Sequence, residues 1–68
     1  MGNASKVQRW VRAYLEVRGP VPYRDIVTDL CYWHPGIAPY DVRVALNAMS
    51  RANVIEVDHT NAVTLRTP

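Results

Sequence analysis

Two clusters of proline and glycine set the strongest limit on how this chain folds. The first is Gly19-Pro20-Val21-Pro22, and the second runs from Pro35-Gly36 to Pro39. Proline cannot continue the interior of a helix, and glycine readily takes the left-handed conformation that ends one. Neither cluster can therefore lie within a helix, and the chain is divided into three segments.

The first segment predicts an amphipathic helix over residues 6–18. Its apolar residues recur at the i, i+3, i+4, i+7 spacing of one helix face. Asn3 or Ser5 can cap this helix, Gly19 ends it, and residues 1–4 are expected to be a frayed terminus. The apolar face consists of Val7, Trp10, Val11, Tyr14 and Leu15.

The second segment predicts a helix over residues 23–34, closed by Pro35-Gly36. Before it, Val21 lies between two prolines, so it is extended and can form at most a very short strand. Asp25 falls in the first turn of the helix, where the helix dipole favours a carboxylate. The expected buried side is Ile26, Val27 and Leu30.

The third segment predicts a helix over residues 39–52 and then a β-hairpin over residues 54–66. Pro39 suits the first helical position because its missing N–H would have no partner there, and Asn53 suits a left-handed helix end. VIEVD and AVTLR alternate apolar with polar residues around a short polar turn, which is typical of paired strands. The expected buried residues are Val42, Ala45, Leu46 and Met49 in the helix, with Val54 or Ile55, Val57, Val63 and Leu65 in the hairpin.

The size and charge of the chain favour one small domain with basic character. Its 68 residues are 49% hydrophobic, and the net charge of +2 is unevenly spread: +4 over residues 1–24, −3 over 25–41 and +1 over 42–68. Seven of the eight basic residues are arginine, which suits phosphate and base edges as well as ion pairs. A nucleic-acid binder fits this balance. With one cysteine and no long apolar run, we expect a cytoplasmic protein without a disulfide or a membrane segment.

The run Cys31-Tyr32-Trp33-His34 gathers four reactive or aromatic side chains. Structural zinc needs about four ligands, and Cys31 and His34 supply only two. A Cys–His nucleophile would need an orienting third group and a cleft. We therefore expect no enzyme activity, no cofactor and no metal. Trp33 follows Ile26 and Leu30 at helical spacing and is expected to extend the core, with Tyr32 pointing outward; the alternative is an exposed Tyr32–Trp33 patch for a partner or a second copy.

The order helix, extended piece, helix, turn, helix, hairpin resembles a winged helix-turn-helix domain. The resemblance covers residues 6–66 and is sharpest in GIAPYDVRVALNAMSRANVIEV. The chain departs from the pattern in the turn, where five residues, CYWHP, separate Leu30 from Gly36. Short chains of this kind are frequent among prokaryotic, phage and archaeal-virus regulators. The matching positions are Gly36, Ile37, Val42, Ala45, Leu46, Met49, Asn53 and Ile55.

By this resemblance, the third helix is a recognition helix that enters the DNA major groove. At about 100° per residue, the side opposite its buried face carries Tyr40, Val44, Asn47 and Arg51, with Arg43 beside them. Arginine pairs with guanine, asparagine with adenine, and valine meets the thymine methyl group. The alternative is an ordinary solvated face.

The hairpin tip His59-Thr60-Asn61 would be the wing, and Arg24 could bind a phosphate. Asp25, Asp29 and Asp41 would repel DNA if they faced it. The predicted function is sequence-specific binding of double-stranded DNA by a transcription regulator, and a homodimer is consistent with it because one recognition helix reads only a half-site. The alternatives are a protein-interaction module, with a partner bound through Tyr32, Tyr40 and Val44, and an excisionase-like factor that bends DNA.

Overall fold

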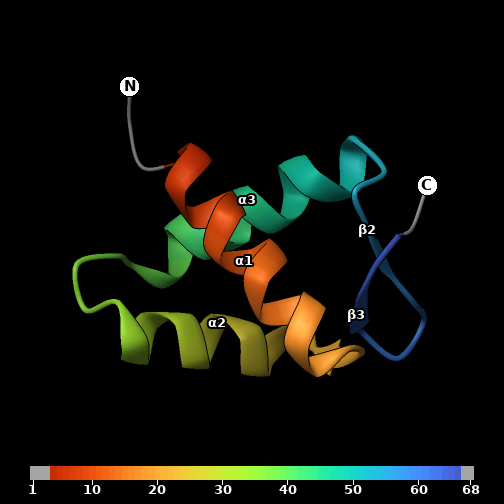
Figure 1. Ribbon diagram of the computed structural model, residues 1–68, viewed down its shortest axis with the longest axis horizontal. Helices are drawn as coiled ribbons and strands as arrows, with labels where there is room; N and C mark the ends of the chain where they lie inside the picture. Colours follow the sequence, from red (N-terminus) through yellow and green to blue (C-terminus); the bar gives the residue numbers. More distant parts are fainter. Residues whose placement is uncertain (1–3, 67–68) are drawn as a thin grey trace.

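The protein is a small bundle of three helices with an antiparallel sheet at one end (Figure 1). The computed structural model describes residues 4–66. This is the layout of a winged helix-turn-helix, as the sequence predicts, and no predicted boundary is displaced by more than two residues. The elements are α1 Ala4–Arg18, β1 Val21–Pro22, α2 Tyr23–Trp33, α3 Pro39–Arg51, β2 Ile55–Val57 and β3 Ala62–Leu65.

The beginning and end of each helix follow the local sequence. Gly19 and Asn53 both take the left-handed conformation, with φ of 75° and 62°, directly after α1 and after the last turn of α3. Pro39 is the first residue of α3, as predicted. Ser5 lies inside α1, so it is not a cap. The predicted Asn3 cap and residues 1–3 of the expected frayed terminus lie outside the described residues, whereas Ala4, also expected to be frayed, is the first residue of α1.

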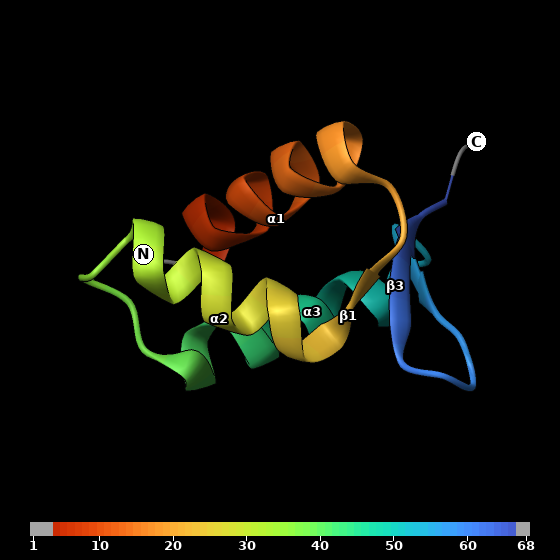
Figure 2. The ribbon, with the colours of Figure 1, turned by 90° about the horizontal axis from the view of Figure 1, so that it is seen from below.

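The sheet has one strand more than the predicted hairpin, in the order β1-β3-β2. The short extended piece between the two prolines pairs with the hairpin, Val21 opposite Val63 and Pro22 opposite Ala62. The backbone N–H of Tyr23 also donates a hydrogen bond to the carbonyl oxygen of Asn61, at 2.8 Å. The hairpin is therefore fixed to the start of α2 (Figure 2).

The core forms where all three helices and the sheet meet. α3 packs across both α1 and α2, and its four predicted apolar residues are all buried. Val27, Val54, Val57 and Leu65 are only half-buried and pack against the edge of the core. The buried residues are Val7, Val11, Tyr14, Leu15, Val21, Ile26, Leu30, Ile37, Val42, Ala45, Leu46, Met49, Ile55 and Val63.

The prediction that Trp33 extends the core is wrong. α2 does continue to Trp33, so the inserted residues add helical length as expected. However, the Trp33 side chain remains 48% exposed, and Leu30 is the last buried residue of α2. The indole lies instead beside the Tyr14 ring, with 5.7 Å between ring centroids. Tyr32 is 80% exposed and points outward, as predicted.

A hydrogen bond joins α1 to α2 at this edge. The Tyr14 hydroxyl donates to the Asp29 carboxylate at 2.6 Å. Burial, followed by the hydrogen bond to Asp29 and the negative charge there, raises the pKa of Tyr14 to about 12. The hydroxyl therefore holds its proton more tightly in the folded protein than in the unfolded chain.

The Tyr14 hydroxyl should make stability depend on pH in the alkaline range. Since its folded pKa exceeds its unfolded value near 10, its contribution is complete below pH 10 and is lost as the pH rises through about 12. We expect the free energy of unfolding to fall more steeply for the wild type than for Tyr14→Phe over this interval, as measured by urea denaturation. Parallel curves for the two proteins would contradict this account.

Candidate nucleic-acid interface

The exposed side of α3 is set by the burial of its other side. With Val42, Ala45, Leu46 and Met49 packed inward, all five predicted recognition residues are exposed. The start of the helix is fixed by Asp41, whose carboxylate accepts a hydrogen bond from the backbone N–H of Ala38 at 3.0 Å. The exposed fractions of the two large apolar side chains are 71% for Tyr40 and 40% for Val44.

Two of the predicted basic residues share a hollow between α2 and α3. Arg24, in the first turn of α2, and Arg43, on α3, both line this space of about 400 Å³. The two arginines come from different helices and line the same space. The remaining lining residues are Tyr23, Val27, Thr28 and Pro39.

A second hollow, of about 360 Å³, lies between α3 and the hairpin. Asn47 lines it from α3, one turn beyond Arg43, and Asn61 lines it from the hairpin turn. Tyr23 lines both hollows, so they are neighbours on one face. That face extends from the start of α2 across α3 to the hairpin. Leu46, Ser50 and Val57 complete the second hollow.

The other predicted recognition residues lie outside these hollows. Tyr40, Val44 and Arg51 are exposed on α3 but line neither space. The structure therefore brings together Arg24, Arg43, Asn47 and Asn61 around Tyr23, and leaves the remaining three further around the helix.

The hairpin tip is held by one carboxylate. Asp58 Oδ1 accepts hydrogen bonds from the backbone N–H and the hydroxyl of Thr60, at 2.8 and 2.7 Å, and from the backbone N–H of Ala62 at 3.0 Å. The Thr60 hydroxyl thus donates within the turn, and His59, Thr60 and Asn61 are all exposed. These hydrogen bonds, above all the one from the Thr60 hydroxyl, hold the pKa of Asp58 below its usual value.

Two of the three carboxylates that could repel DNA accept hydrogen bonds from other residues of the chain. Asp29 is bonded to Tyr14 on the α1 side of α2, and Asp41 accepts the Ala38 N–H. Asp25 lies one helical turn before Asp29 and therefore on the same side of α2.

The sequence did not reveal the role of Tyr23, Thr28 or Ser50 in this face. Each is an unremarkable helix residue until the hairpin and α3 are placed beside it. Only the position of Tyr23 could have been predicted, because Tyr23 directly follows the extended Val21-Pro22 piece that joins the sheet.

Cys31 and His34 belong to different contacts. Cys31 is half-buried, and burial, with a smaller effect of Asp41, raises the pKa of its thiol. The His34 ring stacks on Trp10 with 3.6 Å between ring centroids. Within residues 4–66, no three His, Cys, Asp or Glu side chains gather as metal ligands, and no helix has the length and apolar character needed to cross a membrane.

Comparisons of the chain with protein-family models, with curated proteins and with solved structures found no match.

Removal of the Asp58 carboxylate should loosen the hairpin tip. Three hydrogen bonds converge on Oδ1, so in Asp58→Ala the amide protons of Thr60 and Ala62 should exchange faster with solvent. In the wild type the same faster exchange should appear at acid pH. The stabilising contribution of the Asp58 carboxylate is complete above its unfolded pKa near 3.9 and is lost as the pH falls through its lowered folded pKa. Equal exchange in wild type and Asp58→Ala at neutral pH would contradict this role.

Proposed function

We propose that this protein binds double-stranded DNA with sequence preference through the face formed by the start of α2, the exposed side of α3 and the hairpin, and that it acts as a transcription regulator. The observation that carries the proposal is the position of Arg43 and Asn47. They lie one turn apart on α3, and each lines a hollow that a neighbouring element completes.

The side chains on this face suit different parts of a duplex. Arg43 presents the two-pronged donor that matches guanine, and Asn47 presents the donor and acceptor that match adenine. Arg24 lines the same hollow as Arg43 but comes from the first turn of α2, a position suited to a phosphate. Val44, 40% exposed, can meet a thymine methyl group.

The electrostatic balance of the face supports an anionic ligand. Arg24, Arg43 and Arg51 are all exposed, and none forms an ion pair within the part of the chain that the structure describes. Asp29 and Asp41 are engaged by Tyr14 and Ala38, as described above. Arg66, near the hairpin end, is instead paired with Glu56 at 3.6 Å, so we expect the wing to contribute less than α3.

The proposed function assigns the protein to the compartment that holds DNA, which for a small prokaryotic or viral regulator is the cytoplasm. It involves no catalysis and no cofactor.

A second candidate function is recognition of a protein partner by α3. It is favoured by the exposure of Tyr40 at 71%, since tyrosine is enriched in protein interfaces. In this case Tyr40→Ala would abolish partner binding, and neutralising Arg24 or Arg43 would have little effect.

Binding to a random-sequence duplex should weaken steeply with salt. Each phosphate neutralised by an arginine contributes a slope of about 0.9 in the logarithm of affinity against the logarithm of salt concentration. We expect Arg24→Ala to lower the affinity for every sequence and reduce this slope by about one, as measured by fluorescence anisotropy. The matched control is Arg12→Ala, an equal charge change on α1, away from both hollows. Equal effects of the two substitutions, or no binding at low salt, would overturn the proposed face.

Asn47→Ala should act on sequence preference. Loss of one bidentate base contact costs about 1–3 kcal/mol of discrimination at the contacted position. After a preferred site has been selected from a random duplex library, we expect Asn47→Ala to lose preference at one base pair and to retain its affinity for random duplex. A variant that selects the same site as the wild type would show that Asn47 does not read DNA.

A further inference from the structure

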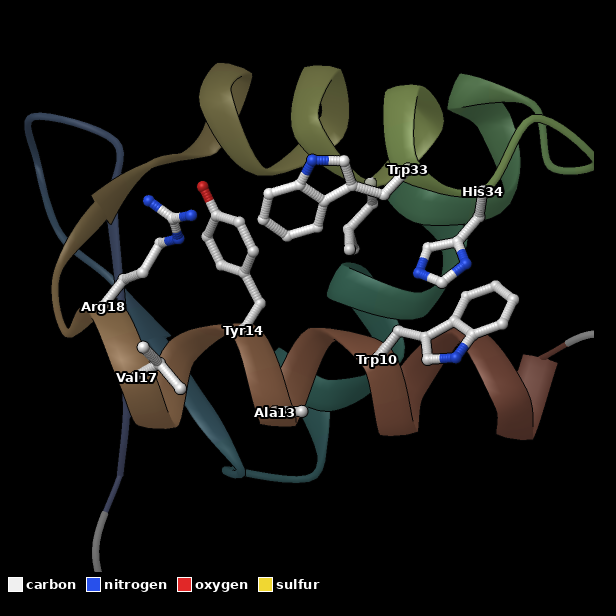
Figure 3. A pocket seen from close by; sticks show the side chains of 8 residues that line it. Trp10, Ala13, Tyr14, Val17, Arg18, Trp33 and His34 are labelled. Atoms are coloured by element: carbon white, nitrogen blue, oxygen red, sulfur yellow. The ribbon is translucent and has the colours of Figure 1, made fainter.

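A second, aromatic surface lies between α1 and the end of α2. It is a groove of about 260 Å³ lined by Trp10, Tyr14 and Val17 of α1 and by Trp33 and His34 at the end of α2 (Figure 3). In this view α3 lies behind the groove. Because the buried side of α3 packs against α1 and α2, its exposed recognition side faces away from the groove.

The aromatic side chains that line the groove already stack on one another. The Trp10 and His34 rings are nearly parallel, 6° apart, at 3.6 Å between centroids, and the Trp33 ring lies against Tyr14. Trp33 nevertheless stays 48% exposed at the groove. Partly exposed aromatic side chains are enriched at protein interfaces, so the groove suits contact with a protein surface.

Two large apolar side chains that line this groove are exposed, Val17 at 85% and Trp33 at 48%. Tyr32, 80% exposed, precedes Trp33 in the chain but does not line the groove. A single exposed valine is ordinary, but an aromatic residue and a valine that line one groove form a patch. Within residues 4–66, the only other large exposed apolar residues are Tyr40 and Val44 on α3, which belong to the proposed DNA face.

Charges of opposite sign lie on the two sides of the groove. Along α1, Lys6 lies near Trp10, and the Arg18 guanidinium lies 4.9 Å from the Tyr14 ring centroid. Along α2, the Asp29 carboxylate accepts the hydrogen bond from Tyr14, and Asp25 lies one helical turn before Asp29 on the same side of the helix. Arg18 forms no ion pair with another described residue, although its guanidinium also lies 5.3 Å from the Trp33 ring centroid. One side of the groove is thus basic and the other acidic.

We propose that the groove pairs two copies of this chain, with α1 of each copy lying over α2 of the other. A two-fold axis parallel to the groove exchanges its basic and acidic sides, so the surface is complementary to itself. Arg18 and Asp25 lie at the same end of the groove, at the end of α1 and the start of α2. Each Arg18 would therefore meet Asp25 of the other copy, and the exposed Val17 and Trp33 side chains would be covered.

Such a dimer has a consequence for DNA binding, and this step rests on the proposed function. With the groove at the interface, the two recognition sides of α3 face outward on opposite sides of the dimer. The pair would hold two separate duplex segments, rather than the two halves of one palindromic site that a side-by-side dimer reads.

Exchange of the two charges tests the pairing directly. Sedimentation velocity of the wild type at protein concentrations up to about 1 mM should detect dimers, which requires a dissociation constant of about 1 mM or lower. Arg18→Glu alone and Asp25→Arg alone should each weaken dimerisation at least 10-fold, because each places like charges opposite one another twice. An equimolar mixture of the two variants should recover the wild-type dimer, since both pairs are then again of opposite sign.

The matched control is Arg12→Glu, the same charge reversal on the side of α1 that lies away from the groove; it should dimerise like the wild type. Far-UV circular dichroism verifies that each variant is folded. A monomeric wild type at 1 mM, or a mixture that dimerises no better than the single variants, would overturn the pairing.

A bridging assay tests the consequence. Duplexes fixed to beads should capture a second, fluorescent duplex in the presence of wild-type protein, and Arg18→Glu should bind the fixed duplex without capturing the second one. Dimers that bind DNA but do not bridge would overturn only the opposed arrangement. Dimers that bind no DNA would overturn the proposed function and leave the pairing intact.

Discussion

The burial of one stripe of α3 is the interaction on which the rest of this structure depends. Val42, Ala45, Leu46 and Met49 pack between α1 and α2, and none is more than 3% exposed. Replacing a buried leucine with alanine costs about 2–5 kcal/mol, a large part of the roughly 5–15 kcal/mol that holds a small domain together. The same packing orients the opposite side of the helix, so the core and the candidate interface are set by one pattern of residues.

The sequence predicted the elements well because their signals are local. Helix periodicity, Gly19, Pro39 and Asn53 each act within one turn, and each is found as expected. What the sequence could not show depends on contacts between distant residues. The pairing of Val21 with Val63 adds a third strand, and it links two parts of the chain that no local pattern connects.

The candidate site shows the same difference between local signals and contacts between distant residues. Helical spacing correctly predicted the exposure of Tyr40, Arg43, Val44, Asn47 and Arg51, but it could not show which of them meet other elements. Only the placement of α2 and the hairpin distinguishes Arg43 and Asn47, and adds Tyr23 between them. Trp33 illustrates the converse, because its helical spacing matched the core stripe while its indole lies beside Tyr14 at the edge between α1 and α2 and stays 48% exposed.

The most direct test of the DNA-binding face is a nuclear magnetic resonance titration of the labelled protein with a short duplex. The proposed function predicts that the largest shift changes occur at the start of α2, along Arg43 and Asn47, and at Asn61, with little change for Trp10 or Val17. Changes concentrated along the groove between α1 and α2, with α3 unaffected, would contradict the proposal that the exposed side of α3 recognises DNA.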